Sequence, residues 1–296
     1  METQLIRTFL VVARTRNFTT AAGELHLSQS TVTAQIQTLE RTLDVRLFDR
    51  VPRGAHLTDA GRRLLPAADA VQDAEQRLRA AARADAVPGG VVAVAAGDTL
   101  CSLHLPEVIA SLRGSHPGIG VHLRPAGTRA ALDALLSGRA DLALLLEDTV
   151  EHPDAHTEVL AREPLQFVGP PGHPLTTRDT PATWRELAAE DVYLHEEGCS
   201  YSDRIAAHLR ATAAGDRLLT RLGSSEAVRN CVAAGLGISV LPRSAVHHAL
   251  AAGTLRPVNG PAVDDVPVRL ARHRTRFASP AVRVVAQALT DHFTAG

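Results

Sequence analysis

The chain has 296 residues, of which 45% are hydrophobic, and a formal net charge of −1. A chain of this length can bury a complete core and divides into two or three units. Its balanced charge excludes a basic nucleic-acid coat protein and an acidic disordered tail. Residues 1–65 nevertheless carry nine Arg and six acidic residues, net +3, whereas the remainder carries 22 Arg and 26 acidic residues, net −4. A small basic N-terminal module therefore precedes a larger, slightly acidic body.

The three cysteines, Cys101, Cys199 and Cys231, are too few and too scattered for the disulfide framework of a secreted protein. No charged and then apolar leader follows Met1, and no apolar run approaches the ~18 residues of a membrane span. We therefore expect a cytoplasmic protein, and no motif indicates a metal or another cofactor.

The first forty residues show three apolar stripes at helical spacing. A second helix is expected to begin with Thr19 as its N-cap, and Ser28 is expected to cap a third. The stripes are formed by Leu5, Phe9 and Val12, then by Ala21, Ala22 and Leu25, and then by Val32, Ile36 and Leu39. Two helices joined by a turn of three or four residues make a helix-turn-helix.

Pro52-Arg53-Gly54 separates two short apolar strands, which predicts a β-hairpin and therefore the wing of a winged helix. A long helix is expected from Thr58 to about Arg83. Its apolar seam, at spacings of 4, 3, 4 and 3, consists of Leu64, Ala68, Val71, Glu75 and Leu78. Such a seam favours pairing with a second copy of the chain. The alternative is a helix that packs on its own module.

After the Pro/Gly-rich stretch at 86–90, the pattern changes to alternating strands and helices, which predicts an α/β body with parallel sheets and ligand sites at the strand carboxyl ends. Strands are expected at 91–97, 120–127, 140–147, 163–171, 191–196, 237–242 and 266–274. Helices are expected at 103–117, 131–138, 202–211 and 225–235, with a final helix capped by Ser279-Pro280. Periodicity leaves open whether this body is one domain or two lobes.

Three sequence blocks occur in a characteristic order: "F-T-x-A-A-x-x-L-x-L-S-Q-S-T-V-T-x-Q-I-x-x-L-E" at 18–40, "L-F-x-R" and "L-T-x-A-G" at 47–61, and "AAGLGISVLP" at 233–242. In these blocks the chain resembles LysR-type transcriptional regulators over essentially its whole length. The resemblance implies a homodimer or homotetramer that binds two sites upstream of a promoter. It also implies a winged helix-turn-helix over 1–58, a dimerising linker helix over 59–87, and an effector domain over 88–296 that is similar to periplasmic solute-binding proteins. In that domain, lobe 1 is expected at about 91–160 and 267–296, and lobe 2 at about 161–266.

The third helix is expected in the major groove of double-stranded promoter DNA, where Gln can bond bidentately to adenine and Ser or Thr can contact base edges or phosphate. The residues expected to face the groove are Gln29, Ser30, Thr31, Thr33 and Gln35. Without the flanking blocks, the same residues would be interpreted as an ordinary solvated helix face. Ser28 is expected to cap the helix and not to contact bases.

Many relatives carry Arg where this chain has Ala34, and another basic residue where it has Gln37. Because affinity for DNA comes largely from neutralised phosphates, the missing charge must come from elsewhere. We expect Thr19, Arg50 and Arg53 to complete the DNA-binding set. The surrounding cations are Arg14, Arg16, Arg41 and Arg46, of which Arg41 and Arg46 pair with Glu40 and Asp44 in an alternative interpretation.

In the resembled fold a small-molecule effector lies between the lobes. Mapped onto this chain, the effector set is Thr99, Leu100, Cys101, Ser102, Thr128, Cys199, Ser200, Tyr201, Arg204 and Ser225. Thr99 to Ser102 are expected at the N-terminus of a helix that begins near Leu103, and Thr128 opens another helix. Helix N-termini present free N–H groups and partial positive charge, so the expected effector is a carboxylate or another anion.

Two alternatives to a reversibly bound effector remain open at the level of sequence. Cys199 near a helix N-terminus is expected to have a lowered pKa, which favours a thiol-based redox sensor, with a Cys101–Cys199 bridge as one form of it. The second alternative is a metabolite-binding protein or enzyme with a vestigial helix-turn-helix. No H-E-x-x-H, G-x-S-x-G or G-x-x-x-x-G-K-[ST] motif occurs, so we do not expect an enzyme.

Overall fold

The computed structural model describes residues 2–51, 54–81, 88–212 and 218–294. The chain divides into two compact units. The first consists of residues 1–87 with 275–279, and the second of residues 88–274 with 280–296. Within the described residues, no helix is both long and apolar enough to cross a membrane.

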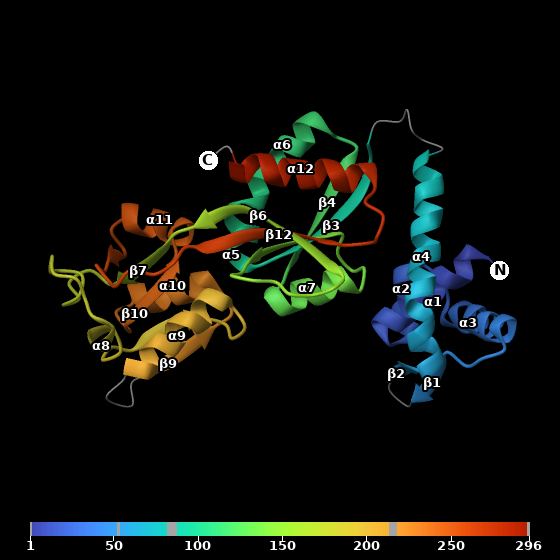
Figure 1. Ribbon diagram of the computed structural model, residues 1–296, viewed down its shortest axis with the longest axis horizontal. Helices are drawn as coiled ribbons and strands as arrows, with labels where there is room; N and C mark the ends of the chain where they lie inside the picture. The colour runs from blue at the N-terminus through green and yellow to red at the C-terminus, as the bar shows by residue number, and fades with distance from the viewer. Residues whose placement is uncertain (1, 52–53, 82–87, 213–217, 295–296) are drawn as a thin grey trace. The chain divides into compact units, whose positions relative to one another are not determined.

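The first unit is a helix-turn-helix followed by a hairpin and a long helix (Figure 1). Its elements are α1 (Thr3–Thr15), α2 (Phe18–Leu25), α3 (Gln29–Leu43), β1 (Phe48–Val51), β2 (Gly54–Leu57) and α4 (Asp59–Ala81). The three predicted stripes pack together in one core, in which Phe9, Val32 and Leu39 are completely buried. β1 and β2 pair antiparallel, from Phe48 opposite Leu57 to Val51 opposite Gly54, so the predicted wing is present. Its tip, Pro52 and Arg53, lies outside the described residues.

Hydrogen bonds at the helix starts confirm one predicted cap and correct the other. The hydroxyl of Ser28 accepts the backbone N–H of Thr31, as expected for the N-cap of α3. The cap of α2, however, is Asn17, whose side-chain carbonyl accepts the backbone N–H groups of Thr19 and Thr20 at 2.8 and 3.1 Å. Asn is as good an N-cap as Ser or Thr, and its position two residues earlier places Thr19 inside the helix.

The apolar seam of α4 is divided between two environments. Ala68 is 1% exposed and Leu64 packs beside it against the core of the first unit, so this half of the seam lies on its own module. Val71 and Leu78, one and three turns further along, are 36% and 72% exposed. The first half of the seam thus packs on its own module, as the alternative interpretation proposed. The second half leaves apolar side chains exposed, where a second copy of the chain could cover them.

The second unit contains two five-stranded sheets, so the question that periodicity left open is decided in favour of two lobes. Lobe 1 has the strand order β4-β3-β5-β12-β6 and lobe 2 the order β11-β7-β10-β8-β9. The strands of lobe 1 are β3 (Gly90–Ala96), β4 (Ile119–Pro125), β5 (Leu142–Leu146), β6 (Ala155–Glu163) and β12 (Val266–His273). Those of lobe 2 are β7 (Leu165–Gly169), β8 (Val192–His195), β9 (Leu219–Leu222), β10 (Ile238–Pro242) and β11 (Arg256–Pro257).

The sequence predicted parallel sheets, but both sheets contain parallel and antiparallel pairs. β3 pairs parallel with β4 and β5, and β8 pairs parallel with β9 and β10. β12 runs antiparallel to both β5 and β6, and β7 runs antiparallel to β10 and β11. The antiparallel pairs arise because the chain crosses between the lobes twice, first from β6 into β7 and later back into β12. Figure 1 shows these two crossing segments side by side. Sequence patterning did not reveal β6, β9 or β11.

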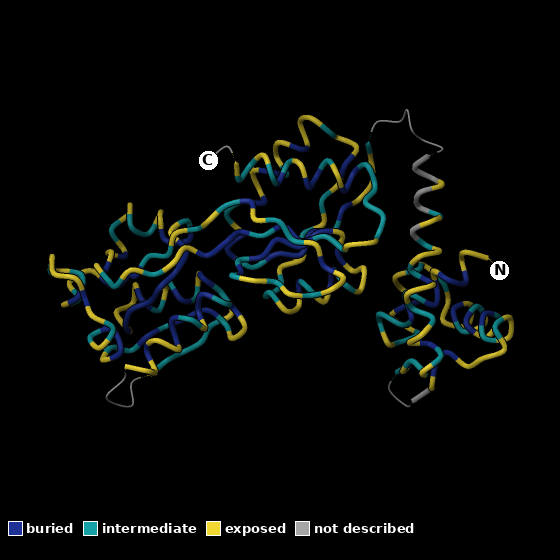
Figure 2. The backbone as a smooth tube through the Cα atoms, in the orientation of Figure 1, coloured by how far each residue is buried: buried dark blue, intermediate teal, exposed yellow. Residues whose placement is uncertain are grey.

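Helices cover the faces of both sheets. They are α5 (Asp98–Leu103), α6 (Leu105–Ser115), α7 (Thr128–Leu136) and α12 (Pro280–Thr294) in lobe 1, and α8 (Trp184–Leu187), α9 (Ser200–Thr212), α10 (Ser225–Ala233) and α11 (Arg243–Ala251) in lobe 2. Figure 2 shows that burial is greatest along the strands, as in Leu142, Leu144 and Val240, which are completely buried. α5, α8 and α11 were not expected from the sequence.

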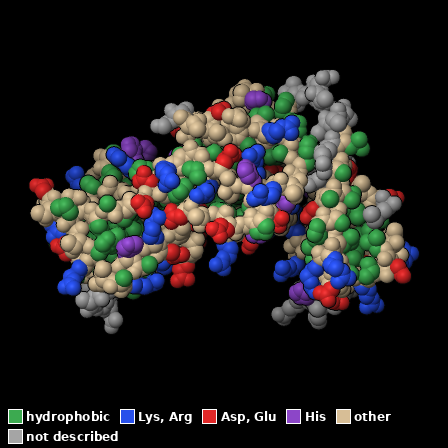
Figure 3. All heavy atoms as spheres, in the orientation of Figure 1, with side chains coloured by type: hydrophobic (Ala, Val, Ile, Leu, Met, Phe, Trp, Pro, Cys, Tyr) green, Lys and Arg blue, Asp and Glu red, His purple; other side chains and the backbone are tan. Residues whose placement is uncertain are grey.

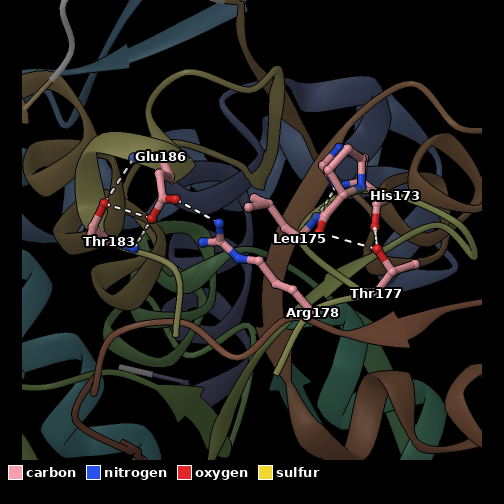
Figure 4. A network of polar contacts seen from close by, with 7 residues as sticks. His173, Leu175, Thr177, Arg178, Thr183 and Glu186 are labelled. Atoms are coloured by element: carbon pink, nitrogen blue, oxygen red, sulfur yellow. Dashed lines mark hydrogen bonds and ion pairs between the residues drawn. The ribbon is translucent and has the colours of Figure 1, made fainter. Parts of the chain in front are cut away.

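A polar network fixes the start of the short helix α8 (Figure 4). Thr183 and Glu186 form a capping box, in which the Thr183 hydroxyl accepts the N–H of Glu186 and the Glu186 carboxylate accepts the N–H of Thr183. The Arg178 guanidinium donates to the same carboxylate at 2.7 Å. Together these donors lower the pKa of Glu186 to about 2. The network compensates for a helix that is too short to be stable alone.

Candidate DNA-binding and effector-binding sites

The outer face of α3 carries small polar side chains in a row. Gln29, Ser30 and Thr31 are exposed, and Thr33 is half-buried. The hydroxyls of Ser30 and Thr31 lie 2.7 and 2.8 Å from that of Ser28, so the first turn is held in one hydrogen-bonded arrangement. These groups are neutral donors and acceptors on the second helix of a helix-turn-helix, the element that enters the major groove in this motif.

Gln35 departs from the expected arrangement. Its side-chain carbonyl accepts a hydrogen bond from the hydroxyl of Thr8 on α1 at 2.5 Å, and Thr8 is completely buried. The carbonyl of the Gln35 amide thereby helps to fix α3 against α1. A bidentate contact with adenine needs this carbonyl together with the NH2 group, so it would compete with the bond from Thr8.

The cations around the first unit fall into two groups. Arg14 forms an ion pair with Glu24. Arg16, Arg41 and Arg46 are exposed. Neither the Arg41–Glu40 pair nor the Arg46–Asp44 pair of the alternative interpretation is found among the described residues. Arg41 donates instead to the carbonyl of Gln37 and the hydroxyl of Thr38, and Glu40 accepts the backbone N–H groups of Leu47 and Phe48. Thr19 is exposed on α2, whereas the side chains of Arg50 and Arg53 lie outside the described part of the chain.

At the interface of the two lobes, the start of α5 meets the start of α10. The hydroxyls of Thr99 and Ser225 lie 2.8 Å apart, and both residues are buried, at 5% and 4% exposure. The Asp98 carboxylate accepts the backbone N–H of Ser225 at 3.1 Å and the hydroxyl of Ser224 at 3.4 Å. The structure thus brings Thr99 and Ser225 together, both of which the sequence placed in the effector set, and it adds Asp98, which that set did not include.

A second contact between the lobes lies at the start of α7, where Glu196 of lobe 2 meets Gly127 of lobe 1. Beside it is a hydrogen bond within lobe 1. The Thr128 hydroxyl donates to the buried Glu147 carboxylate at 2.6 Å, and burial raises the pKa of that carboxyl. Opposite, Glu196 of lobe 2 approaches Gly127 so closely that a Cβ at Gly127 would lie 2.0 Å from its Oε1. A side chain at Gly127 would therefore force the Glu196 carboxylate to move.

The other residues expected to contact an effector have local partners. Leu100 is buried in the core, and the Ser102 hydroxyl donates to the backbone carbonyl of Asp98. Both residues belong to α5, a separate short helix, and not to a loop that precedes α6 as expected from the sequence. Ser200 accepts the N–H of Asp148 at 3.1 Å. Arg204 forms an ion pair with Asp148 at 2.7 Å and donates to the carbonyl of Asp264 at 2.8 Å. The Arg204 guanidinium therefore joins two segments of the protein.

The cysteine chemistry differs from the expectation. Cys199 and Tyr201 are 9% and 2% exposed and pack with Val266, against the segments that cross between the lobes. Burial raises the pKa of the Cys199 thiol to about 12, and the expected lowering at the helix N-terminus is therefore wrong. Burial and the Asp98 carboxylate raise the pKa of Cys101 to about 11. Both thiols, like that of Cys231, are free in the structure.

Comparison with known families matches both units. Residues 3–62 match the bacterial regulatory helix-turn-helix protein of the lysR family, and residues 85–294 match the LysR substrate binding domain. The chain belongs to the LysR family of transcriptional regulators. As a LysR-type protein, it combines a DNA-binding helix-turn-helix with an effector-binding domain, and the three sequence blocks that suggested this are confirmed.

Relatives of similar length support the assignment to the LysR family. The chain is 30% identical to the uncharacterized HTH-type transcriptional regulator YfiE of Escherichia coli over all of both chains. It is 28% identical to the HTH-type transcriptional regulator GltR of Bacillus subtilis, over 99% of this chain and 97% of that protein. Both relatives carry the name of transcriptional regulators.

Solved structures show the same fold. Full-length OxyR from Pseudomonas aeruginosa, in a variant, superposes with a TM-score of 0.78 at 26% identity, covering 99% of this LysR-type chain and 97% of that one. CbnR in a complex with its target DNA superposes with a TM-score of 0.55 at 23% identity, covering 99% and 100%. Among the residues described in this LysR-type protein, no group of three or more His, Cys, Asp or Glu is arranged to hold a metal ion.

Proposed function

We propose that this LysR-type regulator binds promoter DNA through the outer face of α3 and the wing, and that a small molecule bound between the lobes controls it. The observation that supports the first part is the exposed row of Gln29, Ser30 and Thr31 on the second helix of a helix-turn-helix. Thr19, Thr33, Arg50 and Arg53 complete the proposed DNA contacts. Gln35 is left out of the proposed base-reading set because it bonds to Thr8.

We propose a separate role for each of three parts of the chain. Residues 1–58 bind DNA, residues 59–87 carry the helix that pairs with another copy, and residues 88–296 bind the effector. The proposed assembly is a cytoplasmic dimer or tetramer, and the exposed second half of the α4 seam supports pairing of two copies. An effector that binds two arrangements of the lobes with different affinity shifts the equilibrium between them, and so the geometry of the assembly on DNA.

The DNA-binding part is tested by fluorescence anisotropy of the purified protein with the intergenic DNA upstream of its own gene, at low and physiological salt. We expect saturable binding that weakens steeply with salt and that unrelated competitor DNA does not abolish. Absence of binding at low salt would favour the alternative in which the helix-turn-helix is vestigial.

The location of the effector site is tested by Thr99→Val. This change removes the hydroxyl that meets Ser225 while keeping the shape of the side chain. We expect the variant to bind operator DNA and to lose its response to the effector. Loss of DNA binding as well would indicate that Thr99 is only structural.

A redox trigger at Cys199 is not supported by the structure. The thiolate is the form that reacts with oxidants, and burial disfavours it at this position. A reversibly bound ligand needs no such thiolate and is the function that we propose.

A further inference from the structure

Two helix N-termini at the lobe interface already receive carboxylates, each from the opposite lobe. Asp98 of lobe 1 accepts the N–H of Ser225 at the start of α10 in lobe 2. Glu196 of lobe 2 lies against Gly127, the N-cap of α7 in lobe 1. A helix N-terminus attracts negative charge through its free N–H groups and its dipole. In this protein its own side chains supply that charge.

The cations near these carboxylates are committed to other partners. Arg204 pairs with Asp148, and Arg221 pairs with Asp203 at 2.8 Å. Arg269 donates to the backbone carbonyls of Glu147 and Asp148. Of the nitrogens of Arg221, only Nε is buried without an acceptor in the described chain.

Three carboxylates at the interface therefore have no cationic partner among the described residues: Asp98, Glu147 and Glu196. With Asp148 and Asp203, five carboxylates face the three guanidiniums of Arg204, Arg221 and Arg269. The group carries excess negative charge when all its members are ionised, and Figure 3 shows acidic side chains interspersed with arginines on the visible face of the second unit. Glu147 shows the consequence of burying such charge, because burial raises its pKa.

His195 is a further unsatisfied group at the same place. It ends β8, is 8% exposed, and its buried Nδ1 has no hydrogen-bond partner among the described residues. The adjacent Glu196 carboxylate would lie 3.8 Å from a Cβ at Gly223, and the next residue, Ser224, donates to Asp98 at 3.4 Å, so carboxylates from the two lobes approach the same segment. Arg221 is also close, and donates to the backbone carbonyl of His195 at 3.0 Å. Burial lowers its pKa, which favours the neutral ring. In the tautomer that carries its hydrogen on Nε2, the free Nδ1 accepts an N–H.

Building on the proposed function, we propose that the effector of this site is an organic cation that carries a primary ammonium or guanidinium group. Its N–H groups bond to Asp98, Glu196 and the Nδ1 of His195. An anion would add charge to an already negative group, whereas a cation supplies both the missing charge and the missing donors. The anion that the helix N-termini suggested from sequence is thus replaced by the carboxylates of the protein itself.

Binding of the cation has a structural consequence. The Asp98–Ser225 and Thr99–Ser225 hydrogen bonds hold the two lobes together at this point. A ligand that bonds to Oδ2 of Asp98 competes with the Ser225 N–H and the Ser224 hydroxyl for that oxygen. The ligand therefore changes how the lobes are held, which is the coupling that a regulator of this family needs.

Thermal unfolding of the intact protein tests the inference with defined probes. The cationic probes are putrescine, L-lysine and L-arginine, and the anionic probes are succinate and benzoate, all at matched ionic strength. We expect at least one cationic probe to raise the unfolding temperature saturably, on the order of 5 °C at a hundredfold excess over its Kd. We expect no saturable rise with either anion. Failure of all three cations, or stabilisation by an anion alone, overturns the inference.

Neighbouring glutamates provide a matched pair of variants. Glu196→Gln removes the carboxylate at Gly127, while Glu197→Gln changes an exposed carboxylate one residue further along. We expect at least tenfold weaker binding of the responding cation by Glu196→Gln and by Asp98→Asn, and unchanged binding by Glu197→Gln. Far-UV circular dichroism establishes that each variant is folded. Equal affinity in all variants contradicts the assignment of these carboxylates.

DNA binding measured on the same wild-type preparation distinguishes an error in the nature of the effector from an error in the proposed function. If the protein binds its upstream DNA and ignores the cations, only the nature of the effector is wrong. If it fails to bind DNA, the proposed function itself fails, whatever the thermal shifts show.

Discussion

The reactivity of a cysteine depends on its thiolate, and Cys199 lies where a thiolate is unfavourable. Proximity to the start of α9 favours the charged form, but the side chain is 9% exposed and packs against Tyr201 and Val266. The net result is a pKa raised to about 12. Desolvation outweighs the helix dipole here because the dipole contributes typically 0.3–1 kcal/mol, whereas burial of an uncompensated charge costs several times as much.

This difference predicts how fast the thiols react. At pH 8, iodoacetamide should modify Cys199 in the native protein at least tenfold more slowly than in urea, because only unfolding exposes it. Half-exposed Cys231 serves as the internal control and should react with less difference between the two conditions. Mass spectrometry of proteolytic fragments measures both. Rapid native modification of Cys199 would restore the redox alternative.

At the scale of elements, α4 shows how one apolar seam serves two purposes. Its N-terminal half completes the core of the first unit through Ala68, while Leu78 remains 72% exposed. An exposed leucine on a long helix gains free energy when a second copy covers it, at roughly 25 cal/mol per Å² of buried apolar surface.

The exposed half of α4 can be tested by charge. Leu78→Asp should shift the protein toward a smaller oligomer in sedimentation velocity, with at least tenfold weaker association, because pairing would bury an unpaired carboxylate. Gln72→Asp, which lies about 120° away around the helix, should leave the distribution unchanged. An unchanged mass for Leu78→Asp would mean that this part of α4 does not pair.

The start of α8 predicts a dependence on acid. Arg178 and the Thr183 donors lower the pKa of Glu186 from 4.5 to about 2, so folding favours its charged form. The associated stability is present above about pH 4.5 and is lost as the pH falls toward 2. Glu186→Gln should therefore lower the unfolding temperature at pH 7 and make the loss between pH 5 and 3 shallower. Exposed Glu151→Gln is the control, and an equal change there would contradict the role of the network.

At the scale of the whole molecule, charge is divided unequally along the chain, and this division predicts two kinds of DNA-binding defect. Arg53→Ala should weaken binding to most sequences and reduce the salt slope by roughly one phosphate contact. Gln29→Ala should instead lose about 1–3 kcal/mol of discrimination at one base pair. Anisotropy with operator and scrambled DNA at several salt concentrations measures both, with exposed Gln4→Ala as the control. If the two variants behaved alike, α3 and the wing would not have separate roles.

Local signals along the chain were sufficient for the first unit. Three helical stripes, a Ser cap and a Pro-Arg-Gly turn are each made by residues within a few positions of one another, and the structure has the helices and the hairpin that they predicted. The exceptions involve choices between near-equal local partners, such as Asn17 in place of Thr19 as the cap of α2. Gln35 is different, because its partner Thr8 lies 27 residues away.

The family, the helix-turn-helix and the strand-helix alternation of the second unit were thus determined by the sequence itself, because they depend on spacing and on local motifs. The two lobes, the mixed sheets and the charge of the proposed effector site were decided only by tertiary structure. Asp98 and Ser225 are 127 residues apart, and Gly127 meets Glu196 from the other lobe. Helix N-termini can be located from local sequence, but the carboxylates that neutralise them come from distant segments that only the folded chain brings together.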